Sequence, residues 1–187
     1  MKFSRFPCPL AFAAAIAFTS ALPANAVIVI NGGFETGDLT GWTQFGNTGD
    51  TGVVAGFSHS GSFSFYDGAI GSLGGIHQVL TTSPGDSYTL DFWLQNNGGT
   101  PSEFQVSWNA IVEIDTVNPA VFGWTEYTFP VTGTGSDTLT FAFRQDPNWF
   151  HLDDISVTEN QVPDVGLTSS LLGLGLLSLA VLRRKLR

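Results

Sequence analysis

The chain has 187 residues, which leaves room between its two ends for one domain of about 140 residues. All sixteen acidic residues but only one basic residue, Arg144, lie between residues 27 and 166. This balance argues against nucleic acid as a ligand, because its phosphates need Lys and Arg. Cys8 is the only cysteine, so an intrachain disulfide and a cysteine-based zinc site are excluded.

The first 26 residues predict a secretory signal peptide. Lys2 and Arg5 provide a basic start, residues 10–22 are apolar, and Ala24 and Ala26 are the small residues that a signal peptidase accepts. The apolar run is too short for an uncleaved membrane anchor. We therefore expect cleavage after Ala26, which leaves Val27 as the first residue of an exported protein.

Residues 27–159 alternate between apolar and polar side chains and show no sustained helical period, which predicts β-strands. In residues 87–95, for example, Leu90 and Phe92 share one face, and Asp91 and Trp93 share the other. Residues 104–109, 126–131 and 138–144 alternate in the same way, with turn-forming Gly, Pro, Asn and Asp clusters between the runs. The pattern predicts an all-β, two-sheet sandwich of jelly-roll type. The glycine-rich stretch 47–75 predicts no clear strand.

Several polar residues and one tryptophan fall opposite the apolar stripes, and they form a candidate ligand-binding face if their strands are neighbours. They are Trp93, Gln95, Gln105, Ser107, Asn109, Glu126 and Arg144. Sugar rings stack on flat aromatic side chains, and amides and charged groups bind their hydroxyls, so this face would suit a glycan. The alternative is that Trp93 packs under a loop.

We expect structural roles for Arg144 and for three further tryptophans. Arg144 is the only cation of the middle region, so we expect it to pair with Asp91 or Glu126 across a sheet. Three further tryptophans, namely Trp42, Trp124 and Trp149, are expected at the edges of the core.

Two parts of this region resemble the galactose-binding-like jelly rolls, which include many carbohydrate-binding modules. The opening Asn31-Gly32-Gly33-Phe34-Glu35, followed by Gly41-Trp42, is similar to the first segment of that family. Residues 124–129, 139–144 and 152–157 are similar to its closing strands. The resemblance spans about residues 27–159, and it indicates the fold better than the ligand.

The resemblance also implies a structural calcium ion between Glu35 and the closing pair Asp153 and Asp154. Calcium takes six to eight oxygen ligands, and backbone carbonyls near residues 31–33 could complete the set. Neighbours on a regular strand point to opposite faces, so we expect Asp154 to be a direct ligand and Asp153 to lie outside it. The alternative is that these carboxylates face water or cap turns.

The sequence contains no recognisable catalytic motif. Around Ser58, the second glycine of a nucleophile elbow comes one residue late, at Gly61. Nothing near His59, His77 or His151 supports a serine triad, and there is no phosphate loop, dinucleotide fingerprint or zinc motif. We therefore expect a protein that is not an enzyme.

The C-terminal end predicts a membrane-spanning helix with a sorting motif before it. Residues 165–182 are apolar and would span about 27 Å as a helix, close to the roughly 30 Å of a bilayer core. The basic residues 183–187 would stay in the cytoplasm, which places the domain outside. Val162-Pro163-Asp164-Val165-Gly166 with this helix and basic end resembles the PEP-CTERM class of sorting signals. It is closest to the VPDSG type, with Val165 in the place of Ser.

These parts together predict a signal peptide (1–26), a β-sandwich domain (27–160) and a sorting tail (161–187). The tail's resemblance implies cleavage within residues 162–166 by an exosortase-type enzyme, after an initial anchorage in the inner membrane. We expect a cell-surface or extracellular-matrix protein that binds polysaccharide, since such tails are associated with exopolysaccharide-producing bacteria. The alternative is a structural or adhesive protein with a protein partner or with no specific ligand.

Overall fold

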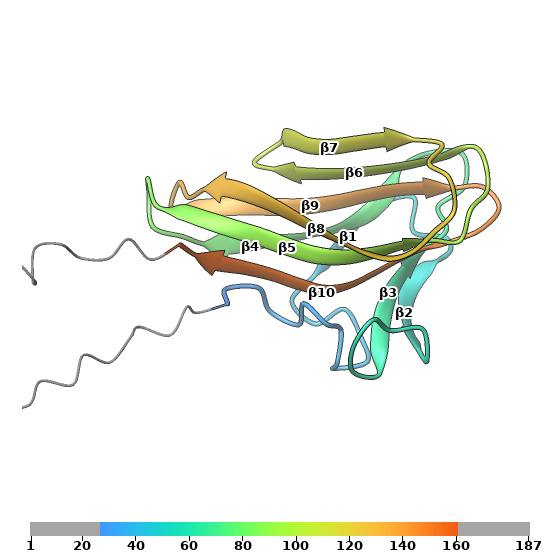
Figure 1. Cartoon of the computed structure of the whole chain (residues 1–187), viewed down its shortest axis with the longest axis horizontal. Helices are drawn as coiled ribbons and strands as arrows, with labels where there is room; N and C mark the ends of the chain where they lie inside the picture. The colour runs from blue at the N-terminus through green and yellow to red at the C-terminus, as the bar shows by residue number, and fades with distance from the viewer. Residues whose placement is uncertain (1–26, 161–187) are drawn as a thin grey trace, which may run out of the picture.

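The computed structural model describes residues 27–160, which form ten strands in two antiparallel sheets packed face to face (Figure 1). The first sheet has the order β1-β4-β9-β6-β7, and the second sheet has the order β2-β3-β10-β5-β8. The strands are β1 Thr43–Gly46, β2 Thr51–Ala55, β3 Phe63–Asp67, β4 Gly74–Thr81, β5 Ser87–Asn96, β6 Ser102–Trp108, β7 Ile111–Val117, β8 Phe122–Thr132, β9 Ser136–Gln145 and β10 Phe150–Glu159. The all-β, two-sheet prediction is confirmed, and the signal peptide and sorting tail lie outside the described residues.

The apolar stripes seen in the sequence meet between the sheets and form the core. Phe92 on β5 and Phe141 on β9 are fully buried, and their rings meet edge to face at 5.1 Å between centroids. Phe104 and Phe143 are equally buried and lie 5.1 Å apart. Aromatic pairs of this geometry add to the free energy that burial itself supplies, so the strand alternation determines where the core lies.

The opening segment closes the sandwich by running along β10. Ile28 donates a backbone hydrogen bond to Val157, and Ile155 donates one to Gly32. A Cβ on Gly32 would lie 1.9 Å from the Ile155 carbonyl oxygen, so only glycine allows this approach. Two residues later, Phe34 is fully buried in the core. The motif Asn31-Gly32-Gly33-Phe34-Glu35 therefore has a structural role, since it packs the opening segment against β10 and the core.

The stretch without a clear sequence pattern contains β2 and β3. These strands pair with each other over five positions, and β3 joins β10 only through the three positions Phe150 to Leu152. Each strand is five residues long, too short for alternation to stand out. Residues 56–62 connect them and are called loop 56–62 below.

The carboxyl group of Asp67, at the end of β3, is fully buried. Its Oδ1 accepts a hydrogen bond from the Ala69 backbone, while its Oδ2 has no partner. Burial raises the pKa of Asp67 from the ordinary 3.8 to about 7. The folded protein therefore binds this proton more tightly than the unfolded chain does, so Asp67 lowers stability as the pH rises from about 4 to about 7.

We expect Asp67→Asn to stabilise the protein increasingly over that pH range, and by a constant amount above it. A shift of three pKa units corresponds to at most about 4 kcal/mol, and an unpaired amide hydrogen offsets roughly 1–3 kcal/mol of this. Denaturant melts from pH 4 to pH 8 measure the difference. Asp115→Asn, on an exposed position of β7, is the matched control. Equal pH slopes for Asp67→Asn and the wild type would contradict the prediction.

Candidate functional site

Loop 56–62 folds over the outer face of the second sheet and covers the tryptophan that the sequence offered as a sugar platform. The imidazole of His59 stacks on the Trp93 ring, with 3.7 Å between centroids and 10° between planes. His59 also meets Trp124 edge to face. One face of Trp93 is therefore occupied by the protein itself, as in the alternative that Trp93 packs under a loop.

The adjacent acidic pair on β10 holds this loop in place. Asp153 Oδ2 accepts hydrogen bonds from the backbone of His59 (2.8 Å) and Ser60 (3.2 Å). Asp154 accepts the Ser60 hydroxyl and contacts His59 Nδ1, both at 2.7 Å. Burial raises the pKa of Asp153 to about 6. The two carboxylates were expected on opposite faces, but Asp154 has a positive φ of 49° in a register shift of β10, so both reach the same loop.

The third predicted calcium ligand, Glu35, binds the far end of the same loop. Its Oε1 accepts hydrogen bonds from the backbone of Ser62 (2.8 Å) and Phe63 (3.0 Å). A Cβ on Gly33 would lie 3.5 Å from Asp154 Oδ1 and 3.7 Å from Asp153 Oδ1. The structure thus brings the three acidic residues around one loop. Within residues 27–160, however, no three acidic or histidine side chains are close enough together to hold a metal ion.

The other predicted ligand-binding residues do not share a face. Trp93 and Gln95 lie on β5 in the second sheet, whereas Gln105 and Arg144 lie on β6 and β9 in the first. Strand β5 neighbours β10 and β8, so it does not neighbour β6. The expectation of a single polar face is therefore wrong, because the chain crosses between sheets after β5.

Arg144 and Asn109 have structural partners of their own. Arg144 Nη2 donates to Asp146 Oδ2 at 3.0 Å, and the expected partners Asp91 and Glu126 lie on the other sheet. Asn109 forms the turn between β6 and β7, where its amide binds the Thr138 backbone and the Asp137 carboxylate. The Gln95 and Gln105 amides donate to neighbours two residues away, at 2.8 and 2.7 Å.

A cavity of about 460 Å³ opens at one end of the second sheet, and we call it the Trp149 cavity. Its walls carry the rings of Phe57, Tyr66, Trp149 and His151, with Asp50, Asn97, Asn148 and two valines of β2 between them. Trp149 is 40% exposed and Phe57 is 60% exposed, so both rings are accessible. The sequence reading that placed Trp149 at a core edge is wrong.

Two glycines make room for these rings. Gly52 lies opposite Tyr66 across the β2–β3 pair, where a Cβ would come within 3.2 Å of the tyrosine ring. A Cβ on Gly68 would lie 2.7 Å from the Trp149 ring and 3.0 Å from Asp50 Oδ2. The glycines of residues 47–75, which obscured the strand pattern in the sequence, therefore leave the space that the cavity's aromatic rings occupy.

Some polar atoms of the Trp149 cavity form hydrogen bonds within residues 27–160, and others do not. Trp149 Nε1 donates to Asp50 Oδ2 at 3.0 Å, and Asn148 Nδ2 donates to the Asn97 carbonyl at 2.8 Å. His151 is 6% exposed and stacks under Phe57 at 5.6 Å, and its Nδ1 has no partner. Burial lowers the pKa of His151, which favours the neutral imidazole. The cavity can therefore stack against a flat apolar surface while it binds polar groups beside it.

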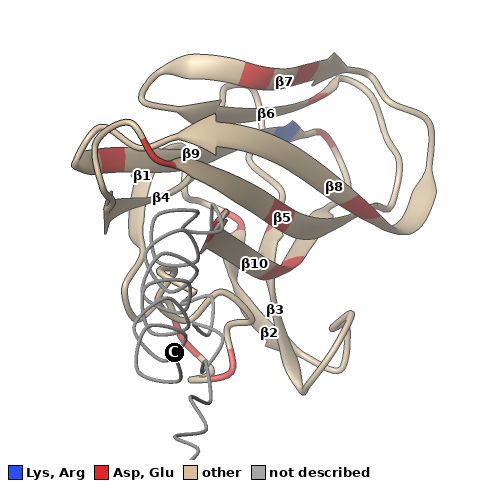
Figure 2. Ribbon diagram, turned by 60° about the vertical axis from the view of Figure 1, so that its left-hand side comes forward, with Lys and Arg blue, Asp and Glu red and all other residues tan. Residues whose placement is uncertain are grey.

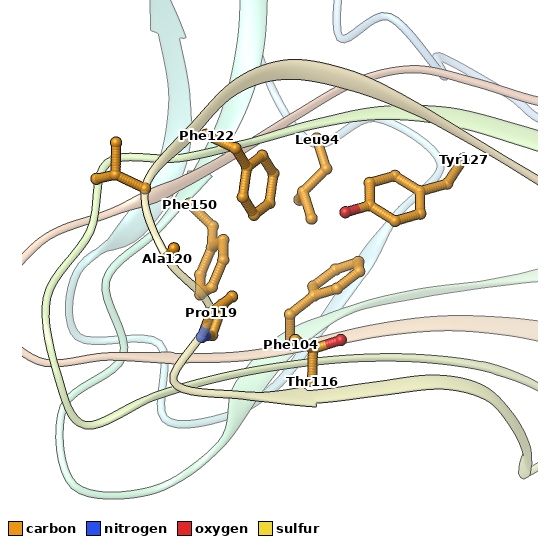
Figure 3. A pocket seen from close by; sticks show the side chains of 9 residues that line it. Leu94, Phe104, Thr116, Pro119, Ala120, Phe122, Tyr127 and Phe150 are labelled. Carbon is orange, nitrogen blue, oxygen red and sulfur yellow. The ribbon is translucent and has the colours of Figure 1, made fainter.

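A second cavity, of about 290 Å³, lies between the sheets and is apolar. Figure 3 shows the rings of Phe104, Phe122, Phe150 and Tyr127 around it. Among residues 27–160, no charged side chain lines it, and Thr116 carries its only hydroxyl besides that of Tyr127. Without converging polar groups it offers little specificity to a ligand, so the Trp149 cavity is the candidate site.

The charged residues of the described domain are almost all acidic. Figure 2 shows acidic residues, coloured red on the ribbon, on both sheets and in the loops. In residues 27–160 the only Lys or Arg is Arg144 on β9, in the first sheet. Among the described residues, none that lines the Trp149 cavity is Lys or Arg.

Comparison with known families and proteins gives two kinds of match. A family model described as the VPDSG-CTERM motif matches residues 161–186. Endo-1,4-beta-xylanase A of Thermoanaerobacterium saccharolyticum is 26% identical over 163 residues, which cover 74% of this chain and 14% of that enzyme. The chain thus spans about a seventh of the length of this relative. The resemblance of the tail to the VPDSG type is confirmed.

Solved structures share the fold. TmCBM61 in complex with beta-1,4-galactotriose has a TM-score of 0.59 and 18% identity, with 72% of this chain and 99% of that chain covered. The CBM22-1 xylan-binding domain of Paenibacillus barcinonensis Xyn10C has a TM-score of 0.54 and 18% identity, covering 76% and 99%. The K3 adhesin domain of Lys-gingipain from Porphyromonas gingivalis has a TM-score of 0.53 and 17% identity, covering 72% and 99%. The chain therefore has the two-sheet β-sandwich fold that these two carbohydrate-binding modules and this adhesin domain share.

Membrane anchorage is a separate question from the fold of the domain. The part of the chain that the structure describes contains no helix with the length and hydropathy needed to cross a bilayer. The apolar span predicted for residues 165–182 lies outside that part.

Proposed function

We propose that this is an exported, non-catalytic cell-surface or extracellular-matrix protein that binds polysaccharide through the Trp149 cavity and is processed at its sorting signal. The observation that carries the binding proposal is the set of accessible aromatic rings beside polar groups in one open cavity. The fold supports it, because carbohydrate-binding modules share this sandwich. The VPDSG-CTERM motif supports export and sorting.

The chemistry of the cavity suits a sugar ring. Trp149 and Phe57 expose flat apolar faces on which the C–H face of a pyranose can stack. The Tyr66 hydroxyl lies beside them and can bind ligand hydroxyls, while His151, whose Nδ1 is buried without a partner among residues 27–160, lies beneath the Phe57 ring. A buried polar atom without a partner costs about 1–3 kcal/mol, so a ligand that reached His151 would recover part of that cost.

The same cavity supports binding without catalysis. Glycoside hydrolysis generally needs two carboxyl groups that flank the scissile bond. In the part of the chain that the structure describes, Asp50 is the only carboxylate that lines the cavity, and its Oδ2 accepts the hydrogen bond of the Trp149 indole. The acidic pair Asp153 and Asp154 is committed to loop 56–62.

Affinity electrophoresis of the purified full chain against a panel of soluble polysaccharides tests the proposal. We expect at least one polysaccharide to retard the wild-type protein, and an excess of its oligosaccharide to restore free migration. A folded protein that no member of a broad neutral, cationic and anionic panel retards would overturn polysaccharide binding.

We also propose that calcium binds beside loop 56–62 through Glu35, Asp153 and Asp154, as the family resemblance implies. Their hard carboxylate oxygens are the donors that calcium prefers, but the three side chains would have to move closer together to hold the ion. Their present partners are backbone N–H groups, His59 and Ser60. An ion would therefore have to replace some of these hydrogen bonds.

We expect calcium to raise the melting temperature of the protein and a chelator to lower it. Binding only to the folded state adds about 2.7 kcal/mol at a hundred times the dissociation constant. Glu35→Ala and Asp154→Ala should each remove the calcium response, whereas Glu113→Ala on β7 should keep it. An unchanged wild-type melt in millimolar calcium would show that the carboxylates act only as loop anchors.

A further inference from the structure

We infer that the Trp149 cavity prefers sugar units that carry a protonated amine over neutral or anionic ones. The inference rests on the proposed function and adds the chemical class of the ligand. It follows from three features of the cavity, namely its aromatic walls, its single carboxylate and its unpaired buried imidazole.

The walls resemble a cage for a cation. Phe57, Tyr66 and Trp149 line one cavity from three different segments, which are loop 56–62, β3 and the turn before β10. The negative face of an aromatic ring attracts an ammonium group, and several rings around one space are a recurrent means of recognising amines. A neutral hydroxyl gains much less from such a face.

The carboxylate of Asp50 lines the same cavity as these aromatic rings. Asp50 Oδ2 accepts the Trp149 indole N–H at 3.0 Å, which fixes the carboxylate beside the ring. No hydrogen bond among residues 27–160 engages Asp50 Oδ1, so that oxygen is available to an ammonium. Bonds between charged donors and carboxylates are stronger than neutral ones, so Asp50 would discriminate an amine from an acetamide.

Within residues 27–160, no Lys or Arg competes for Asp50. Arg144 lies in the first sheet and pairs with Asp146. The imidazole that faces the cavity, His151, is favoured in its neutral form by burial, and His59 is bound to Asp154. The field of the domain therefore attracts amines and repels uronates or sulfates.

The buried imidazole gives an independent sign of a ligand. His151 is 6% exposed, lines the cavity, and leaves Nδ1 without a partner in the described residues. A neutral imidazole with its proton on Nε2 presents Nδ1 as an acceptor. An ammonium or hydroxyl donor of the ligand would satisfy it once the Phe57 ring that stacks on the imidazole had moved aside.

The test compares a β-1,4-linked glucosamine tetrasaccharide with its fully N-acetylated form by calorimetry on the purified full chain. The measurement is made at low salt and at a pH where the amines are charged. We expect the amine form to bind at least about tenfold tighter. Asp50→Asn should reduce this preference to less than about twofold, since asparagine can still accept the Trp149 N–H but carries no charge.

Asp115→Asn, an exposed acid on the first sheet, is the charge-matched control and should keep the full preference. Equal binding of the two oligosaccharides, or tighter binding of the acetylated one, overturns the amine inference while leaving polysaccharide binding intact. A preference that survives Asp50→Asn assigns it to the overall charge of the domain and overturns the site. If neither oligosaccharide binds and an anionic polysaccharide does, the cavity prefers negative rather than positive ligands and the inference is overturned.

Discussion

Trp149→Ala is expected to weaken polysaccharide binding at least roughly 30-fold while changing the melting temperature little. Aromatic anchors at the centre of a binding site commonly cost 2 kcal/mol or more when truncated, which corresponds to that factor. The indole is 40% exposed, so its loss removes ligand-stacking surface without opening the core. Affinity electrophoresis and thermal melting of the same preparations measure both effects.

A milder change at the same position separates stacking from the hydrogen bond. Trp149→Phe keeps a flat ring but loses the N–H that fixes Asp50. We expect an affinity for polysaccharide between that of the wild type and that of the alanine variant. The smaller ring still stacks on the sugar, but Asp50 is less well positioned.

The matched control is Trp124→Ala. Trp124 is a partly buried tryptophan on β8 of the same sheet, and it contacts His59 and His151 but does not line the Trp149 cavity. Its replacement should leave binding within about twofold of the wild type. If Trp124→Ala weakens binding as much as Trp149→Ala does, the ligand lies elsewhere on the outer face, and the proposed cavity is wrong.

The largest expected effect on stability is that of Gly32→Ala, about 3 kcal/mol of lost unfolding free energy, out of the 5–15 kcal/mol typical of a domain. The new Cβ would meet the Ile155 carbonyl oxygen at 1.9 Å, which is backbone and cannot rotate away. The opening segment would have to leave β10, and the fully buried Phe34 would leave the core with it.

Gly123→Ala is the control for this change. No atom lies within 4 Å of a Cβ built on Gly123, so a stability change within about 0.5 kcal/mol is expected. Urea unfolding of both variants against the wild type measures the difference. Similar stabilities for the two variants would show that the opening segment does not contribute to the fold.

The sequence by itself determined the class of fold and most of the core. Alternation in residues 87–95 placed Leu90 and Phe92 inside, and both are fully buried. The C-terminal motif was equally readable, since it matches a known sorting signal at residues 161–186. Such features are local, because a strand's two faces and a linear motif depend only on neighbours in the chain.

Only the tertiary structure decided which polar side chains meet. Trp93 and Gln105 alternate outward in the sequence, yet they lie on opposite sides of the sandwich, because strand pairing joins segments that are far apart in the chain. Trp149 follows a short polar turn, Asp146-Pro147-Asn148, and that turn is the one local feature of the sequence that indicates an exposed ring. It becomes part of a site only because Tyr66, Phe57 and Asp50 approach it from other segments. Faces follow from local alternation, but a binding site depends on long-range contacts, and these are set by how the two sheets are assembled.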